Sequence, residues 1–258
     1  MADYQFITYE VKDEAAYLTI NRPPLNWLDI ATMREMNDAL DQVLAAGPEL
    51  KLLVIQAAGE KAFSVGVDVA DHTDDKVETM IEVFHGIFRR LDRLEIPSLA
   101  VARGAVLGGG CEVVLFCDMV LAAENIKIGQ PEIKLAVFPP IAAAALPAII
   151  GPKKAYEVIL GGEIMRAPEA LACGLVNKVV PVGELAAETE AFVKRFTSLS
   201  GSALRSTKKA IKAGLGKPFA AALDEIEDLY LNDCMKNTDA REGLSSFLEK
   251  RSPVWQNK

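Results

Sequence analysis

The sequence predicts an α/β fold, with a layered core of parallel strands followed by a helical C-terminal region. Two observations carry this prediction. Short apolar or β-branched runs alternate with amphipathic helical patterns up to about residue 141. From Ala142 onward helical patterns follow one another, and 179–181 is the single strand candidate. Because half of the 258 residues are hydrophobic, the chain can bury the core of one large domain with a small helical appendix.

The N-terminal half contains most of the predicted strands. Two short β-rich runs at 7–11 and 15–20 flank Lys12-Asp13-Glu14, which predicts a β-hairpin. The later strands are expected at 52–56, 96–106, 119–123 and 126–128. The segment 57–64 between them is expected to be a loop.

Three helices are predicted between these strands. Asp29 is suited to cap a helix over 30–46, and Gly47-Pro48 ends it. A second amphipathic helix is expected over 77–94, and an apolar third over 110–117. This alternation of strand and helix is typical of parallel sheets.

Helices dominate the rest of the chain. They are predicted at 142–150, 152–160, 168–173, 184–199, 203–213, 218–236 and 240–250. We therefore expect a core over 1–198 and a C-terminal helical cap or trimerisation module over 199–258.

Charge and hydropathy exclude some partners. The net charge of −8 and the isoelectric point near 5.0 argue against a nucleic-acid or anionic-membrane surface. A local basic group at Arg205, Lys208, Lys209, Lys212 and Lys217 could meet a phosphorylated ligand or simply be a solvated helix face. The most apolar stretch, 141–150, is too short to span a bilayer.

The four cysteines predict the compartment. No CxxC pair occurs among Cys111, Cys117, Cys173 and Cys234, so they are interpreted as reduced thiols. The N-terminal stretch MADYQFITYE has no apolar run behind a basic start, so no secretory signal is expected. We expect a cytoplasmic protein.

The stretch from Val101 to Ile133 is the strongest indication of chemistry. An apolar run ends in the triple glycine 108–110, Glu112 follows at a helix start, and Glu132 comes 20 residues later. Glycines before a helix allow backbone amides to approach a ligand and favour negative charge. Two carboxylates beside such a site indicate acid–base work on a carbonyl substrate.

Further segments share the pattern of a known family. In chain order they are NRPPLN at 21–26, KAFSVGVD at 61–68, GAVLGGGCE at 104–112, GQPE at 129–132, APEALACGLV at 167–176, and Asp239, Glu242-Gly243, Phe247 and KRSP at 250–253. Together they resemble the enoyl-CoA hydratase/isomerase (crotonase) family over nearly the whole chain.

The resemblance implies a spiral of ββα units with a helical C-terminal region, assembled as a trimer or a dimer of trimers. It also implies that two backbone N–H groups, here those of Val65 and Gly109, stabilise the enolate of an acyl-CoA thioester. Glu112 and Glu132 would handle the water and the substrate proton, which favours hydration. Coenzyme A would be part of the substrate, with no separate cofactor and no metal.

The substrate-binding residues that the resemblance implies surround these groups. They are Leu25, Trp27, Ser64, Val67, Asp68, Gly108, Pro131, Phe138, Pro140 and Ile141. By itself Asp68 is better read as a cap or turn residue, and Trp27 as a packed loop aromatic. Lys208, Lys212 and Lys250 are candidates for the CoA phosphates. His72 and His85 lack partners at metal-ligand spacing.

The chain departs from the family pattern in two places. The glycine-rich segment that usually follows the second glutamate is replaced by Phe138-Pro139-Pro140-Ile141, which should reshape the acyl pocket wall. Ala70 stands where a lysine is usual, so one CoA contact is in doubt. This wall and the run PPLNWLD at 23–29 are similar to cyclohexa-1,5-diene-1-carbonyl-CoA hydratases.

Other functions stay open at this point. Within the fold, the alternatives are a straight-chain 2-enoyl-CoA hydratase, disfavoured by the altered wall, and a double-bond isomerase. An alternative of another class is a non-catalytic or RNA-binding relative, which the acidic balance and the glutamate pair disfavour.

Overall fold

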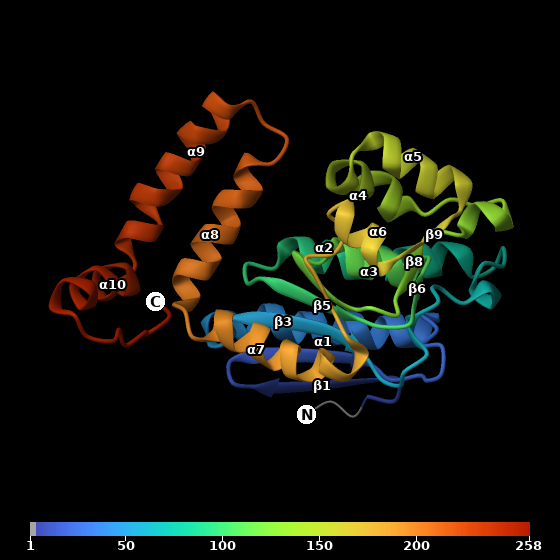
Figure 1. Cartoon of the computed structure of the whole chain (residues 1–258), viewed down its shortest axis with the longest axis horizontal. Helices are drawn as coiled ribbons and strands as arrows, with labels where there is room; N and C mark the ends of the chain where they lie inside the picture. The colour runs from blue at the N-terminus through green and yellow to red at the C-terminus, as the bar shows by residue number, and fades with distance from the viewer. Residues whose placement is uncertain (1–3) are drawn as a thin grey trace.

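The computed structural model describes residues 4–258 and contains two β-sheets (Figure 1). The larger sheet has the order β1(Ile7–Lys12), β2(Ala15–Ile20), β3(Leu52–Ala57), β5(Ser98–Ala102), β7(Met119–Ala123), β10(Lys178–Val180). The smaller sheet has the order β4(Ala62–Ser64), β6(Ala105–Leu107), β8(Lys127–Gly129), β9(Ile164–Arg166). Hairpin β1–β2 is antiparallel as predicted, and every other pair in the larger sheet is parallel.

Each turn of the chain contributes one strand to each sheet. Strands β3, β5 and β7 lie in the larger sheet, and the strands that directly follow them, β4, β6 and β8, lie in the smaller one. A helix follows each of the first two pairs: α2(Val77–Arg93) and α3(Gly109–Phe116). The fold is therefore the predicted α/β spiral of ββα units.

The single strand predicted over 96–106 is wrong, because the chain turns between β5 and β6. Gly104 has φ +64°, and a Cβ there would lie 2.2 Å from the carbonyl oxygen of Lys61. Only glycine fits such a turn. The Ala105 N–H donates to the same oxygen at 3.0 Å, so the turn joins the two sheets.

Two three-residue strands were missed by the sequence analysis. Strand β4 lies in the segment expected to be a loop, and β9 pairs antiparallel with β8 in the region expected to be helical. Strands this short carry no periodicity of their own, because partners distant in sequence stabilise them.

The helices cover both faces of the core, and most predicted helices are confirmed within two or three residues. The remaining ones are α1(Ile30–Ala46), α4(Pro140–Ile150), α5(Pro152–Gly161), α6(Ala167–Ala172), α7(Leu185–Thr197), α8(Gly201–Gly214), α9(Phe219–Asn232) and α10(Thr238–Glu249). Asp29 caps α1 as predicted, since its carboxylate accepts the Thr32 N–H at 2.8 Å. Within residues 4–258 no helix is both long and apolar enough to cross a lipid bilayer.

The last three helices stand beside the core. Figure 1 shows α8 and α9 as a pair that extends away from the sheets, with α10 near their base. Buried Lys208 fastens α8 to the core, because it pairs with Asp118 at 2.7 Å and donates to the carbonyl of Ile96. The predicted division at residue 199 stays a prediction, and α8 begins two residues beyond it.

Candidate active site

The triple glycine forms the turn between β6 and the start of α3, and each glycine is needed for a different contact. Gly108 has φ +55°, and a Cβ there would lie 2.7 Å from Glu132 Oε1. A Cβ on Gly109 would lie 2.9 Å from the Phe84 ring, and one on Gly110 would lie 2.6 Å from Ser64. The turn therefore brings backbone, rather than side chains, against both the second glutamate and β4.

Glu112 lies in the first turn of α3 with only 2% of its surface exposed. Its N–H donates to Gly108 O at 2.9 Å, and its Oε1 accepts the Ala142 N–H at 2.8 Å. Burial, with a smaller contribution from the charge of Glu132, raises the pKa of Glu112 to about 7 against the lowering effect of the Ala142 and Ile141 amides. Such a group can exchange a proton at neutral pH.

Glu132 begins the short 3-10 helix Glu132–Leu135, which follows β8. Burial raises its pKa to about 7 as well. The buried amide of Gln130 lies 3.1 and 3.2 Å from its two carboxylate oxygens and donates when its nitrogen faces them. Gly108 lies against the Glu132 carboxylate, and its carbonyl oxygen accepts the hydrogen bond of the Glu112 N–H. The structure therefore brings the two predicted glutamates to the same turn.

The geometry contradicts the expectation for the Val65 N–H. This group donates to the carbonyl of Leu25 at 3.1 Å, so it is not free to bind a substrate oxygen. The N–H groups of Val67 and Gly109 make no hydrogen bond to any group within residues 4–258. A Cβ on Gly109 would lie 3.0 Å from Val67 Cγ2, so these two residues are neighbours. Val67 replaces Val65 as the candidate donor beside Gly109.

The other predicted substrate-binding residues fall into two groups. Ser64 is fully buried and its Oγ accepts the Gly66 N–H at 3.1 Å, which makes it part of the turn's support. Pro131 directly precedes Glu132, and Pro140 and Ile141 begin α4 beside Glu112. Trp27 and Phe138 are exposed.

Asp68 is a capping residue, as its residue type predicted. Its side chain accepts the Ala70 N–H at 3.0 Å and caps the short 3-10 helix Val69–Asp71. Cys111, between the glycines and Glu112, is buried, and burial together with both glutamates raises the pKa of its thiol well above the usual value. A thiol in this state is not a nucleophile.

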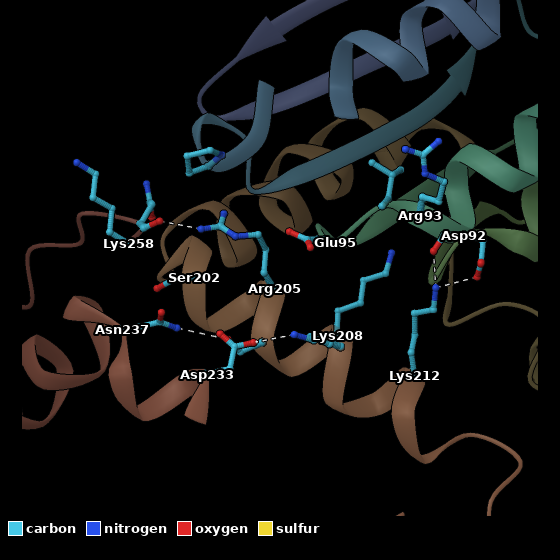
Figure 2. Close-up of a pocket in the computed structure, with 15 residues that line it drawn as sticks. Asp92, Arg93, Glu95, Ser202, Arg205, Lys208, Lys212, Asp233, Asn237 and Lys258 are labelled. Carbon is cyan, nitrogen blue, oxygen red and sulfur yellow. Dashed lines mark hydrogen bonds and ion pairs between the residues drawn. The ribbon is translucent and has the colours of Figure 1, made fainter. Parts of the chain in front are cut away.

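Four members of the basic group lie on α8 and line a cavity of about 620 Å³ between α8, the end of α2 and the C-terminus (Figure 2); they are Arg205, Lys208, Lys209 and Lys212. Carboxylates neutralise its lysines: Lys208 pairs with Asp118, Lys209 with Asp233, and Lys212 with Asp92. Figure 2 shows Lys212 directed at Asp92. Lys208 is buried in its ion pair, so the reading that it holds a CoA phosphate is wrong.

Sequence reasoning missed three groups at the site. These are the Val67 N–H, the Gln130 amide and the Ala142 N–H. Gln130 gave a usable signal, because it is a polar residue at the end of an apolar strand directly before the Pro-Glu pair. The two backbone donors gave none, since any residue type has an N–H.

Comparison with known families accounts for this arrangement. A model described as "Enoyl-CoA hydratase/isomerase" matches residues 10–258. The chain belongs to this family. The predicted resemblance is therefore confirmed over nearly the whole chain.

Individual relatives agree with this membership. A crotonyl-CoA hydratase of Syntrophomonas wolfei is 34% identical over 253 residues, which is 96% of each protein. A cyclohexa-1,5-dienecarbonyl-CoA hydratase of Thauera aromatica is 36% identical over 241 residues, 93% of this chain and 92% of that protein. The crystal structure of an enoyl-CoA hydratase from Bacillus anthracis superposes with a TM-score of 0.93 at 29% identity, over 98% of this chain and 100% of that one.

Proposed function

We propose that the protein is a hydro-lyase that adds water to an α,β-unsaturated acyl-CoA, and that its preferred substrate is a cyclic dienoyl-CoA. The observation that carries the proposal is the pair of glutamates at one glycine turn, buried Glu112 and half-buried Glu132, beside two backbone N–H groups that have no partner within residues 4–258. The hydratases among the family members compared above support the same activity. A double-bond isomerase is the alternative activity within the same family.

The chemistry follows from the charges that develop during hydration. We propose that the Val67 and Gly109 amides bind the thioester oxygen and stabilise its enolate, where losing one such donor typically lowers the rate by about 10²–10³-fold. Glu112 and Glu132 bind the water between them, and one of them deprotonates it as it attacks the β-carbon. A glutamate then returns a proton to the enolate. Since the pKa of each lies near 7, both steps are accessible at neutral pH.

Two observations support a cyclic diene as the acyl group. The start of α4 is Pro139-Pro140-Ile141, a rigid and bulky segment beside Glu112. The Thauera aromatica relative that is named as a hydratase of cyclohexa-1,5-dienecarbonyl-CoA, a cyclic diene, is 36% identical to this chain. On this substrate the proton would go to the vinylogous ring carbon, which gives a 6-hydroxycyclohexenoyl-CoA.

The same proposal includes the assembly and the remaining partners. We propose a trimer or a dimer of trimers, supported by large apolar side chains that stay exposed on the C-terminal helices. They include Phe219, Leu231, Phe247 and Leu248, and Phe247 is 82% exposed. No metal or separate cofactor enters the proposed reaction, and the four free cysteines support a cytoplasmic location.

The test is turnover of the purified protein on crotonyl-CoA and on cyclohexa-1,5-diene-1-carbonyl-CoA. Glu112→Gln and Glu132→Gln should each lower kcat by at least about 10²-fold, whereas Glu49→Gln, at an exposed position, should have no effect. Faster hydration of the cyclic diene supports the full proposal. Preference for crotonyl-CoA overturns the cyclic substrate alone. Absence of activity on both substrates, with no difference between the wild type and the glutamate variants, overturns the proposed hydratase activity.

A further inference from the structure

Glu112 is held by a helix other than its own. The carboxylate extends from α3 to the first turn of α4, where the Ala142 N–H donates to Oε1 at 2.8 Å. Both residues are buried, and Ala142 has no exposed surface. A hydrogen bond to an ionised group in such a place contributes more than an ordinary one.

Few backbone N–H groups in the first turn of α4 could bind a partner other than Glu112. Pro140 occupies the first helical position and has no N–H. The Ala143 N–H donates to the carbonyl of Pro139 at 2.9 Å and closes the first turn. The remaining amides of that turn, those of Ile141 and Ala142, both stabilise the ionised form of Glu112.

The two prolines also limit how this turn can move. Each proline ring restricts its φ angle to a narrow range, so the approach of the chain to α4 is stiffer than a glycine-rich segment would be. Pro139 is buried at the cap position, which holds the turn against the core. The direction of the Ala142 N–H is therefore set before any ligand binds.

We propose that the first turn of α4 is a positioning element for Glu112, in which the Ala142 amide holds Oε1 so that Oε2 is presented to the reacting water. The inference rests on the proposed hydratase role of Glu112. The segment 138–141 that leads into this turn is also the proposed acyl pocket wall. An acyl group that displaces the wall therefore misaligns the carboxylate, and discrimination between acyl groups appears in kcat more than in KM.

The experiment replaces one peptide bond by an ester. L-lactic acid in place of Ala142 removes this N–H and keeps every side chain. The control is L-lactic acid in place of Ala143, which removes the helix bond to Pro139 instead. Because the control loses a hydrogen bond within α4 and the test variant does not, the control perturbs the helix more.

Two readouts are needed, one of them independent of turnover. The first is the titration of Glu112 by the ¹³C shift of its labelled carboxyl, assigned by comparison with Glu112→Gln. The Ala142 N–H favours the ionised form, so the 142 ester should raise the pKa of Glu112 by about one unit and the 143 ester should leave it unchanged. The second readout is the acid limb of the kcat/KM profile, which should move to higher pH by the same amount.

The outcomes separate this inference from the proposed function. An unchanged Glu112 titration in the 142 ester, or an equal shift in both esters, overturns the positioning role. A shift confined to the 142 ester, in a protein without hydratase activity on either substrate, supports the positioning and overturns the proposed function. Ala142→Pro removes the same N–H in a recombinant protein and should shift the titration in the same direction.

Discussion

At the scale of single residues, the site places acids where their charged forms are poorly solvated. Glu112 is 2% exposed, and its carboxylate lies near the Ala142 and Ile141 amides and a second carboxylate, that of Glu132. Such a group lowers the stability of the folded chain at neutral pH, and the same burial gives it a pKa suited to proton transfer. The effect on stability has a definite sign.

Glu112→Gln should stabilise the protein at high pH. The pKa of Glu112 is raised from 4.5 to about 7, so between these values the native state binds more protons than the unfolded state. The contribution of the Glu112 carboxyl group to the free energy of unfolding is fully present below pH 4.5 and is lost as pH rises through 7. We expect the variant to exceed the wild type by up to about 3 kcal/mol at pH 8 and to match it near pH 4.

Urea denaturation at several pH values measures this difference. Glu49→Gln, at an exposed position, is the control and should show no such trend. A constant difference between Glu112→Gln and the wild type across the range would show that folding does not shift the pKa of Glu112.

Gln130→Met should impair catalysis through Glu132. Methionine has a similar volume but no N–H, so the Glu132 carboxylate loses the amide 3.1 and 3.2 Å away. The pKa of Glu132 should rise further, and the limb of the kcat/KM profile that reports Glu132 should move up by about one pH unit. Gln56→Met is the control, because Gln56 bonds Thr19 on the larger sheet. Profiles that coincide for both variants and the wild type would contradict this role.

At the scale of elements, the turn before α3 packs the start of that helix against the smaller sheet. Gly110 lies at the start of a helix, where alanine would ordinarily be favoured by about 1 kcal/mol. Its Cβ, however, would lie 2.6 Å from both Cβ and the carbonyl oxygen of Ser64 in β4. A clash with backbone cannot be relieved by a side-chain movement, so packing outweighs helix propensity here.

Gly110→Ala is therefore expected to lower the free energy of unfolding by about 3 kcal/mol and to reduce hydration by displacing the Gly109 amide. The matched control is Gly183→Ala, since a Cβ there meets nothing within 4 Å. Chemical denaturation and turnover measure both effects. If Gly110→Ala were as stable as the wild type, the close approach of α3 to β4 would be disproved.

At the scale of the whole molecule, the C-terminal residues fasten α10 to α8. Asp239 is buried at the start of α10 and accepts the N–H groups of Gln256 and Asn257 at 2.7 and 2.9 Å. It also accepts the Ser200 hydroxyl at 2.6 Å, just before α8. One carboxylate thus ties the end of the chain to the start of two helices.

Asp239→Ala should loosen the C-terminal helices while the sheets stay folded. Three donors would lose their acceptor, the buried Ser200 hydroxyl and the less buried N–H groups of Gln256 and Asn257, at a cost of about 1–3 kcal/mol for each group that stays out of contact with water. We expect hydrogen exchange to accelerate in α10 and any trimer to weaken in light scattering. Asp233→Ala is the control, because the exposed pair of Asp233 with Lys209 contributes about 0–1 kcal/mol. Equal exchange in the two variants would refute the fastening role.

Local patterns account for what could be predicted correctly. The hairpin, the capped start of α1 and the amphipathic α2 depend on neighbours within a few residues, and the structure has them where expected. Strands β4 and β9 and the break at Gly104 depend on partners far along the chain, so the sequence did not reveal them. The Val65 error has the same origin, because its N–H is used by Leu25, 40 residues earlier.

The sequence by itself determined the family, the order of the helices and of most strands, the glycine turn and the glutamate pair, because these depend on residue identity and local spacing. Only the tertiary structure decided which backbone amides stay free, that Gln130 and Ala142 hold the glutamates, and that burial raises both pKa values to about 7. Backbone donors are the same in every residue, and desolvation depends on what packs around a group. These properties arise when segments distant in sequence come together.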